Sequence, residues 1–147
     1  MSGHADPTRL NLFVEAQARS YSAALAELHR GRKTGHWIWY VFPQLRGLGR
    51  SPASELYGLS GIAEARAYLG HPVLGSRLRE AVAAVCAQPV SAASVLGELD
   101  TMKFRSCLTL FHVAEPGETL FSAALEQFFA GQPDPRTLQL LADQGEA

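Results

Sequence analysis

The residues best suited to chemistry lie in one stretch, residues 35–51, which reads GHWIWYVFPQLRGLGRS. It holds both tryptophans of the chain and then, after a proline, a loop with two glycines and two arginines. Aromatic rings stack on flat ligands, glycine lets the backbone approach a ligand closely, and arginine binds phosphate or carboxylate through forked hydrogen bonds. The pattern therefore predicts a pocket for a small anionic ligand. Its expected binding residues are Trp37, Trp39, Tyr40, Gln44, Arg46, Gly47, Gly49 and Arg50.

A purely structural interpretation of the same stretch stays open. A tight loop between two helices also needs glycine for its turns, and the aromatic run at residues 36–42 suits a core as well as a pocket wall. The loop matches the spacing of neither a phosphate-binding loop nor a dinucleotide-binding fingerprint. The stretch thus indicates an anion-binding site without indicating a reaction.

A second group of polar residues belongs to a helix expected at residues 99–114. At about 100° per residue, Arg105, Ser106 and Thr109 fall on one side of this helix, opposite its apolar residues. Short hydroxyls beside a long cation suit the lining of a polar cleft. We therefore add Arg105, Thr109 and, although it lies away from this face, Lys103 to the predicted ligand-binding residues. The competing interpretation is a solvated face on which Thr109 bonds to the preceding turn.

Two residues are candidates for catalysis, His36 as a general base and Ser106 as a hydroxyl group. On a helix His36 would share a face with Trp39 and Tyr40, and histidine is the side chain that titrates near neutral pH. A catalytic histidine usually needs an acid that orients it, and the sequence shows none beside His36. A histidine at the edge of the core explains this position equally well, so the sequence leaves undecided whether the protein is an enzyme.

Histidine and cysteine usage does not predict a metal site. The five histidines include no pair at metal-ligand spacing, and the two cysteines, Cys86 and Cys107, form no CxxC motif. We therefore expect neither a metal ion nor another cofactor. The chain also lacks a Gly-x-Ser-x-Gly nucleophile motif and the close pair of acids that a glycosidase needs.

Charge is uneven along the chain although its sum is close to zero. Residues 19–50 contain six basic residues and one acid, a net charge of +5, whereas residues 115–147 contain six acids and one base, a net charge of −5. Such asymmetry indicates an anion-binding face or a head-to-tail contact that makes a homo-oligomer. Basic residues at a helix end also favour the helix dipole, which is the simpler explanation. A pI near 6.5 argues against nucleic acid as a partner.

The apolar runs, the N-terminus and the cysteines of the chain indicate in which cellular compartment the protein is expected. No apolar run approaches the roughly 20 residues that span a bilayer, and the N-terminus lacks the basic and apolar regions of a secretory signal. We therefore expect no membrane contact. The cysteines have apolar neighbours, which is typical of buried thiols in a reducing compartment. The expected localisation is cytoplasmic.

Capping and chain-breaking residues predict helices joined by short turns. Asp-Pro and Ser-Pro pairs mark helix entries, and glycines mark helix ends. The aromatic run resembles a strand on propensity alone, but a lone strand would leave its backbone groups unpaired, so we expect a helix that ends before Pro43. Other helices are expected to begin at residues 7 and 52 and to span residues 20–30, 60–69, 71–86, 91–96, 99–114, 119–130 and 136–142.

Length and composition agree with this pattern of elements. A chain of 147 residues, 47% of them hydrophobic and 18% charged, suits one domain with its own core. The sequence therefore predicts an all-α fold, a compact multi-helix bundle with short loops and no sheet. We expect residues 1–147 to form this single domain, with frayed ends at residues 1–6 and 143–147.

Four segments of the chain resemble one bacterial family, the uncharacterised domain of unknown function 1810. They are residues 35–51 (GHWIWYVFPQLRGLGRS), 65–78 (ARAYLGHPVLGSRL), 100–111 (DTMKFRSCLTLF) and 131–138 (GQPDPRTL). The resemblance covers nearly the whole chain and implies a compact all-α domain, but no established activity or catalytic residues. It leads us to expect serine or another small residue where this chain has Cys107, which argues against a cysteine nucleophile there.

Two functions follow from these observations. The first is binding of a nucleotide or an ADP-ribose-like anionic ligand, with hydrolysis or transfer of that ligand left open. In this interpretation aromatic rings of the 35–51 stretch stack on a base, while Arg46, Arg50 and Arg105 bind phosphate. The alternative is a non-catalytic interaction module that uses the two oppositely charged regions for self-association or for a protein partner.

Overall fold

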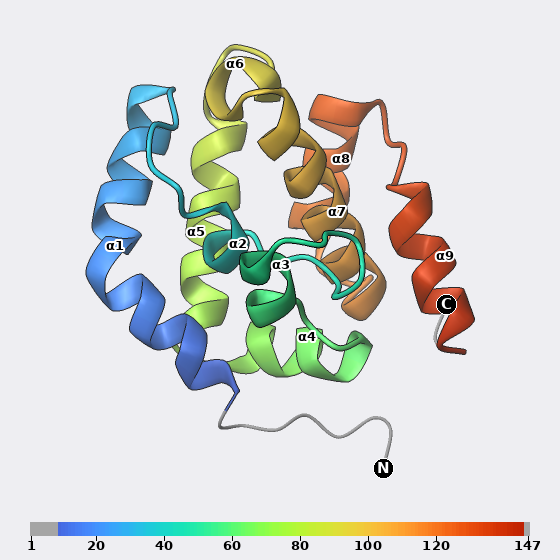
Figure 1. Cartoon of the computed structure of the whole chain (residues 1–147). Helices are drawn as coiled ribbons and strands as arrows, with labels where there is room; N and C mark the ends of the chain where they lie inside the picture. Colours follow the sequence, from blue (N-terminus) through green and yellow to red (C-terminus); the bar gives the residue numbers. More distant parts are fainter. Residues whose placement is uncertain (1–8, 146–147) are drawn as a thin grey trace.

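The computed structural model describes residues 9–145. These residues form helices and no strand (Figure 1). The helices are α1 (Leu10–Arg30), α2 (Ile38–Val41), α3 (Pro52–Tyr57), α4 (Ile62–Gly70), α5 (Leu74–Cys86), α6 (Ala92–Leu96), α7 (Glu98–Ala114), α8 (Thr119–Phe129) and α9 (Pro135–Asp143). The all-α fold predicted from the sequence is therefore confirmed. No helix within residues 9–145 is long and apolar enough to cross a membrane.

The core lies between α1, α4, α5, α7 and α8. Helix α7 packs against α4, α6, α8 and α9, and α5 packs against α1, α4 and α8. A row of buried aromatic rings joins four of these helices, from Phe13 through Tyr68 and Phe111 to Phe121, with neighbouring ring centroids 5.2, 5.6 and 5.7 Å apart. Burial of such rings is the main favourable contribution to folding. Helices α1 and α9 lie on opposite sides of this core (Figure 1).

The break predicted at Ser20 is wrong, because α1 runs without interruption from Leu10 to Arg30. The Ser20 hydroxyl hydrogen-bonds to the Ala16 carbonyl oxygen one turn earlier, at 2.8 Å, and to the Tyr40 hydroxyl, also at 2.8 Å. A serine satisfied in this way is tolerated inside a helix. The end of α1 is where the sequence predicts it, since Gly31 takes the left-handed conformation with φ of 81°.

The aromatic run forms a helix that ends before Pro43, as predicted, but α2 is only one turn long, Ile38–Val41. The loop that follows is fixed by an isolated parallel bridge between Leu45 and Leu59. In this bridge the Arg46 N–H donates to the Leu59 carbonyl oxygen at 2.8 Å, and the Leu59 N–H donates to that of Gln44 at 2.9 Å. Backbone groups that a helix would have paired are thus satisfied across the loop.

Three of the predicted helix entries are capped as their sequences indicate. Ser51, Ser91 and Asp134 accept hydrogen bonds from the backbone N–H groups of Ser54, Ser94 and Thr137. Helices α4 and α5 begin two or three residues later than predicted, an ordinary uncertainty at helix ends. Helix α9 includes Asp143, and the predicted fraying at residues 1–6 lies outside the described residues.

Candidate functional site

A cleft of about 300 Å³ opens where the loop after α2 meets the first half of α7 and the start of α9. Three cations and one acid line it, so we call it the basic cleft. Its volume is at the lower end of the range for small-molecule sites. The lining residues are Gln44, Leu48, Gly49, Leu99, Met102, Lys103, Arg105, Ser106, Asp134 and Arg136.

The loop wall of the cleft is held by its own backbone and by α9. Leu45 is buried and paired with Leu59, and the Arg136 guanidinium donates to the Leu48 carbonyl oxygen at 3.2 Å. Gly47 has φ of 104°, a conformation that favours glycine. Gly49 does not have positive φ. It must be small because a Cβ there would lie 2.8 Å from the Ser54 Cβ.

The opposite wall joins α7 to the start of α9 through Asp134. One carboxylate oxygen of Asp134 accepts hydrogen bonds from the Ser106 hydroxyl at 3.0 Å and from the Thr137 hydroxyl at 2.6 Å. The Thr109 hydroxyl accepts from the Asp134 N–H at 2.8 Å and donates to the Arg105 carbonyl oxygen at 2.8 Å. Thr109 is fully buried. It therefore fastens α9 to α7 and does not line the cleft. Its bond to the Arg105 carbonyl oxygen is the one to the preceding turn that the alternative interpretation expected, but the residue is buried and not on a solvated face.

The three cations of the cleft differ in how free they are to bind a ligand. Arg105 donates from Nε to the Gln132 carbonyl oxygen and from Nη2 to that of Pro133, both at 3.0 Å, so two of its donors already hold the loop before α9. Lys103 has a single partner, Asp100, with Nζ 3.3 Å from Oδ1. Arg136 is exposed. Lys103 and Arg136 are thus the cations most available to an anion.

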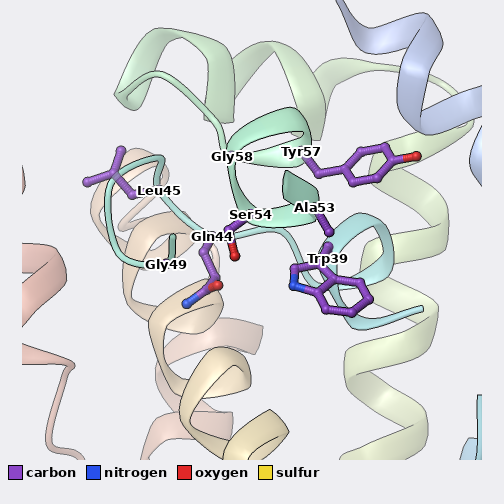
Figure 2. Close-up of a pocket in the computed structure, with 8 residues that line it drawn as sticks. All are labelled: Trp39, Gln44, Leu45, Gly49, Ala53, Ser54, Tyr57 and Gly58. Carbon is purple, nitrogen blue, oxygen red and sulfur yellow. The ribbon is translucent and has the colours of Figure 1, made fainter. Parts of the chain in front are cut away.

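A narrow crevice adjoins the basic cleft, and Gln44 and Gly49 line both (Figure 2). It has a volume of about 10 Å³ and lies between α2 and α3. We call it the Trp39 crevice because Trp39 lines it, and the indole Nε1 of this residue is buried without a hydrogen-bond partner. Its other lining residues are Leu45, Ala53, Ser54, Tyr57 and Gly58.

In the aromatic run at residues 36–42, Trp39 lines a cavity whereas Trp37 belongs to the core. Trp37 is only 2% exposed, and its Nε1 donates to the Glu27 carboxylate at 2.9 Å. Tyr40 is half-buried and packs on Tyr57, with ring centroids 5.3 Å apart. Of the three aromatic residues predicted to bind ligand, Trp39 is the one that lines the crevice.

Several predicted site residues lie outside both cavities. His36, Arg46, Gly47 and Arg50 are exposed, and none of them lines the basic cleft or the Trp39 crevice. Ser106 lines the cleft, but its hydroxyl donates to the Asp134 carboxylate and to the Met102 carbonyl oxygen. No histidine is among the residues that line the cleft, and the titratable group beside the Ser106 hydroxyl is the Asp134 carboxylate.

A buried acid, Glu27, holds the segment that leads into α2. It is not among the site residues that the sequence predicted. The Oε1 atom of Glu27 accepts from the backbone N–H groups of Thr34 and Gly35, at 2.7 and 2.8 Å, and from the Trp37 indole. Burial acts to raise the pKa of Glu27, but the hydrogen bonds from Gly35, Thr34 and Trp37 outweigh it and hold the pKa below its ordinary value of 4.5. The signal in the sequence was that Glu27 is the lone acid among six basic residues.

Lys33 and Asp100 connect Glu27 and its hydrogen-bond donors to the basic cleft. The Lys33 side chain, 7% exposed, lies 5.0 Å above the Trp37 ring, and its Nζ is 2.7 Å from one carboxylate oxygen of Asp100. The other oxygen of Asp100 faces Lys103. Asp100 therefore shares its charge between a buried lysine and a lysine of the cleft.

Apolar residues of the cleft were also missed. Leu99 and Met102, one helical turn apart on α7, are 76% and 67% exposed. They stand beside Lys103 at the mouth of the cleft. Two large apolar side chains exposed together at a polar cavity are typical of a binding surface. Among residues 9–145, no three histidine, cysteine, aspartate or glutamate side chains form a group that could hold a metal ion.

Fold and cleft together define an all-helical protein with an open cavity rich in cations. The family described as protein of unknown function (DUF1810) matches residues 7–141, and this chain belongs to that family. The crystal structure of the conserved hypothetical protein Rv1873 from Mycobacterium tuberculosis, at 1.38 Å, is similar to it over 93% of this chain and 99% of that one. The two are 46% identical, with a TM-score of 0.90. A search of curated proteins found no match.

Proposed function

We propose that the basic cleft binds a small anionic ligand of the nucleotide or ADP-ribose class. The observation that supports this most directly is the convergence of Lys103, Arg105 and Arg136 on one cavity in which Asp134 is the sole acid. Lys103 and Arg136 bind the phosphate group, since charge-assisted hydrogen bonds to phosphate are among the strongest that proteins form. The cavity volume of about 300 Å³ suits a sugar phosphate or a mononucleotide.

The apolar part of such a ligand has a surface to contact at the mouth of the cleft. Leu99 and Met102 are exposed there, and methionine adapts its flexible side chain to flat or irregular groups. This differs from the predicted stacking on the aromatic rings of the 35–51 stretch, because none of Trp37, Trp39 and Tyr40 lines the basic cleft. We propose binding and assign no catalytic role, since the Ser106 hydroxyl bonds to Asp134 and no histidine lines the cavity.

The test is a thermal-shift screen followed by calorimetric titration with phosphate, ribose 5-phosphate, AMP and ADP-ribose. A ligand at 100 times its Kd adds roughly 2.7 kcal/mol of stability, which raises the Tm of a chain of this size by on the order of 5–10 °C. We expect Lys103→Ala and Arg136→Ala each to weaken binding about 10- to 100-fold, the usual loss for one hydrogen bond to a charged group.

Arg46→Ala and Arg50→Ala are the matched controls, because each removes an exposed cation that lies outside the cleft. They should leave the Kd unchanged within about twofold. If these two variants lose as much affinity as Lys103→Ala, the anion binds on the loop instead. No Tm increase with any of the four compounds would contradict the proposal.

An interaction module is the second candidate, and the exposure of Leu99 and Met102 favours it. If these residues contact a second copy of the chain, sedimentation should give a mass above that of the monomer. Leu99→Ser with Met102→Ser should then restore the monomer. A monomer at every protein and salt concentration would count against this function.

A further inference from the structure

The Trp39 indole N–H is a buried donor that nothing in the described structure satisfies. Such groups are rare because an unpaired buried donor has lost its hydrogen bond to water. The nitrogen-bearing edge of the indole faces Ser54 and Gln44 across the crevice, whereas the Tyr57 hydroxyl points away from it (Figure 2). An acceptor in the crevice would complete the hydrogen bonding of Trp39.

The size and polarity of the crevice indicate what that acceptor is. A volume of about 10 Å³ admits a single oxygen-sized group. The polar side chains that line it, Trp39, Gln44, Ser54 and Tyr57, are all uncharged. Trp39 only donates, whereas the Ser54 hydroxyl and the Gln44 amide also accept. This set suits a neutral hydroxyl, which both accepts and donates, better than a phosphate oxygen, which only accepts and carries charge.

We propose that the Trp39 crevice takes one sugar hydroxyl of a phosphorylated sugar or nucleotide whose phosphate lies on Lys103 and Arg136. The inference rests on the proposed function and names the class of its ligand. One molecule reaches both places, because Gln44 and Gly49 line the crevice and the basic cleft alike. Trp39 accordingly selects for a hydroxyl, and the cations select for the anion.

Gly49 lines both cavities. A Cβ at this position would collide with the side chain of Ser54, the residue that faces Trp39. Gly49→Ala should therefore weaken binding of ribose 5-phosphate.

The chain offers an internal control, because its two tryptophans give two indole N–H signals in a ¹H–¹⁵N NMR spectrum. The Trp37 N–H is bonded to Glu27 and should not move, whereas the Trp39 N–H should shift when an acceptor enters the crevice. The probes are ribose 5-phosphate and methyl phosphate, a phosphate monoester without an alcohol hydroxyl. Signals are assigned with Trp39→Phe, which removes the N–H and keeps an aromatic ring.

Ribose 5-phosphate is expected to shift the Trp39 signal and the backbone signals of the basic cleft, and methyl phosphate only those of the cleft. Trp39→Phe should weaken ribose 5-phosphate binding by about three- to tenfold, the usual effect of one neutral hydrogen bond, and leave methyl phosphate unaffected. A Trp39 signal that stays in place while the cleft signals move would overturn the inference and leave the proposed function standing. So would a Trp39 shift of equal size with methyl phosphate. No shift with either probe would overturn both.

Discussion

Replacing Trp37 by alanine is expected to lower the free energy of unfolding by about 3–5 kcal/mol, the usual cost of removing a buried aromatic ring. Trp37 is 2% exposed, and its ring packs on Phe42 with centroids 6.0 Å apart. The ring also lies under Lys33 and donates to Glu27. The substitution therefore leaves a cavity and also removes one donor from a buried carboxylate.

Chemical denaturation of Trp37→Ala beside Trp39→Ala measures this difference. Trp39 is half-buried and its indole N–H has no partner, so its loss should be clearly smaller. For a chain of this size, each kcal/mol corresponds to a Tm change on the order of 3 °C. Equal losses in the two variants would contradict the assignment of Trp37 to the core and Trp39 to the pocket wall.

Glu27→Ala should destabilise the protein by about 3 kcal/mol or more at pH 7, because it leaves buried donors without their charged acceptor. Three N–H groups, those of Thr34, Gly35 and the Trp37 indole, converge on one oxygen of this side chain. Glu27→Gln is the matched control, since an amide oxygen accepts hydrogen bonds in the same place without the charge. We expect it to lose less than half as much as Glu27→Ala, and an equal loss would show that the charge itself is what matters.

The pH dependence of this contribution follows from the lowered pKa of Glu27. The carboxylate is more acidic in the folded protein than in the unfolded chain, where its ordinary value is 4.5. The unfolded chain therefore binds the proton first as pH falls, so the stabilisation is complete above pH 4.5 and is lost as pH decreases through the folded value. The difference in unfolding free energy between the wild type and Glu27→Gln should narrow over that interval. A difference that stays constant from pH 7 to pH 3 would contradict the hydrogen-bond explanation.

Most of the fold could be predicted because its signals are local. The caps at Ser51, Ser91 and Asp134, the helix end at Gly31 and the periodicity of α7 all act within a few residues. The error at Ser20 has a non-local cause, since this serine bonds to Tyr40 on another element as well as to its own helix. Nothing in the residues around Ser20 indicates that partner.

The candidate site could be predicted only in part. Gln44, Gly49, Lys103, Arg105 and Ser106 do line one cavity. The arginines nearest to the glycines in the sequence lie outside it, and a cation from α9, Arg136, stands there instead. Spacing along the chain identifies a loop that can bind an anion, but it does not show which side chains face the loop from other helices.

The helices, their caps and the family could be predicted from the residues alone, because these depend on short-range patterns. The packing of the helices, in contrast, assigns Trp37 to the core, whereas Trp39, two residues later, lines a crevice with an unsatisfied donor. The tertiary structure likewise joined Gln44, Lys103 and Arg136 in one cleft. Burial and charge pairing cannot be predicted in this way, because they arise from how helices far apart in the chain pack together, and one turn of helix sends neighbouring side chains in different directions.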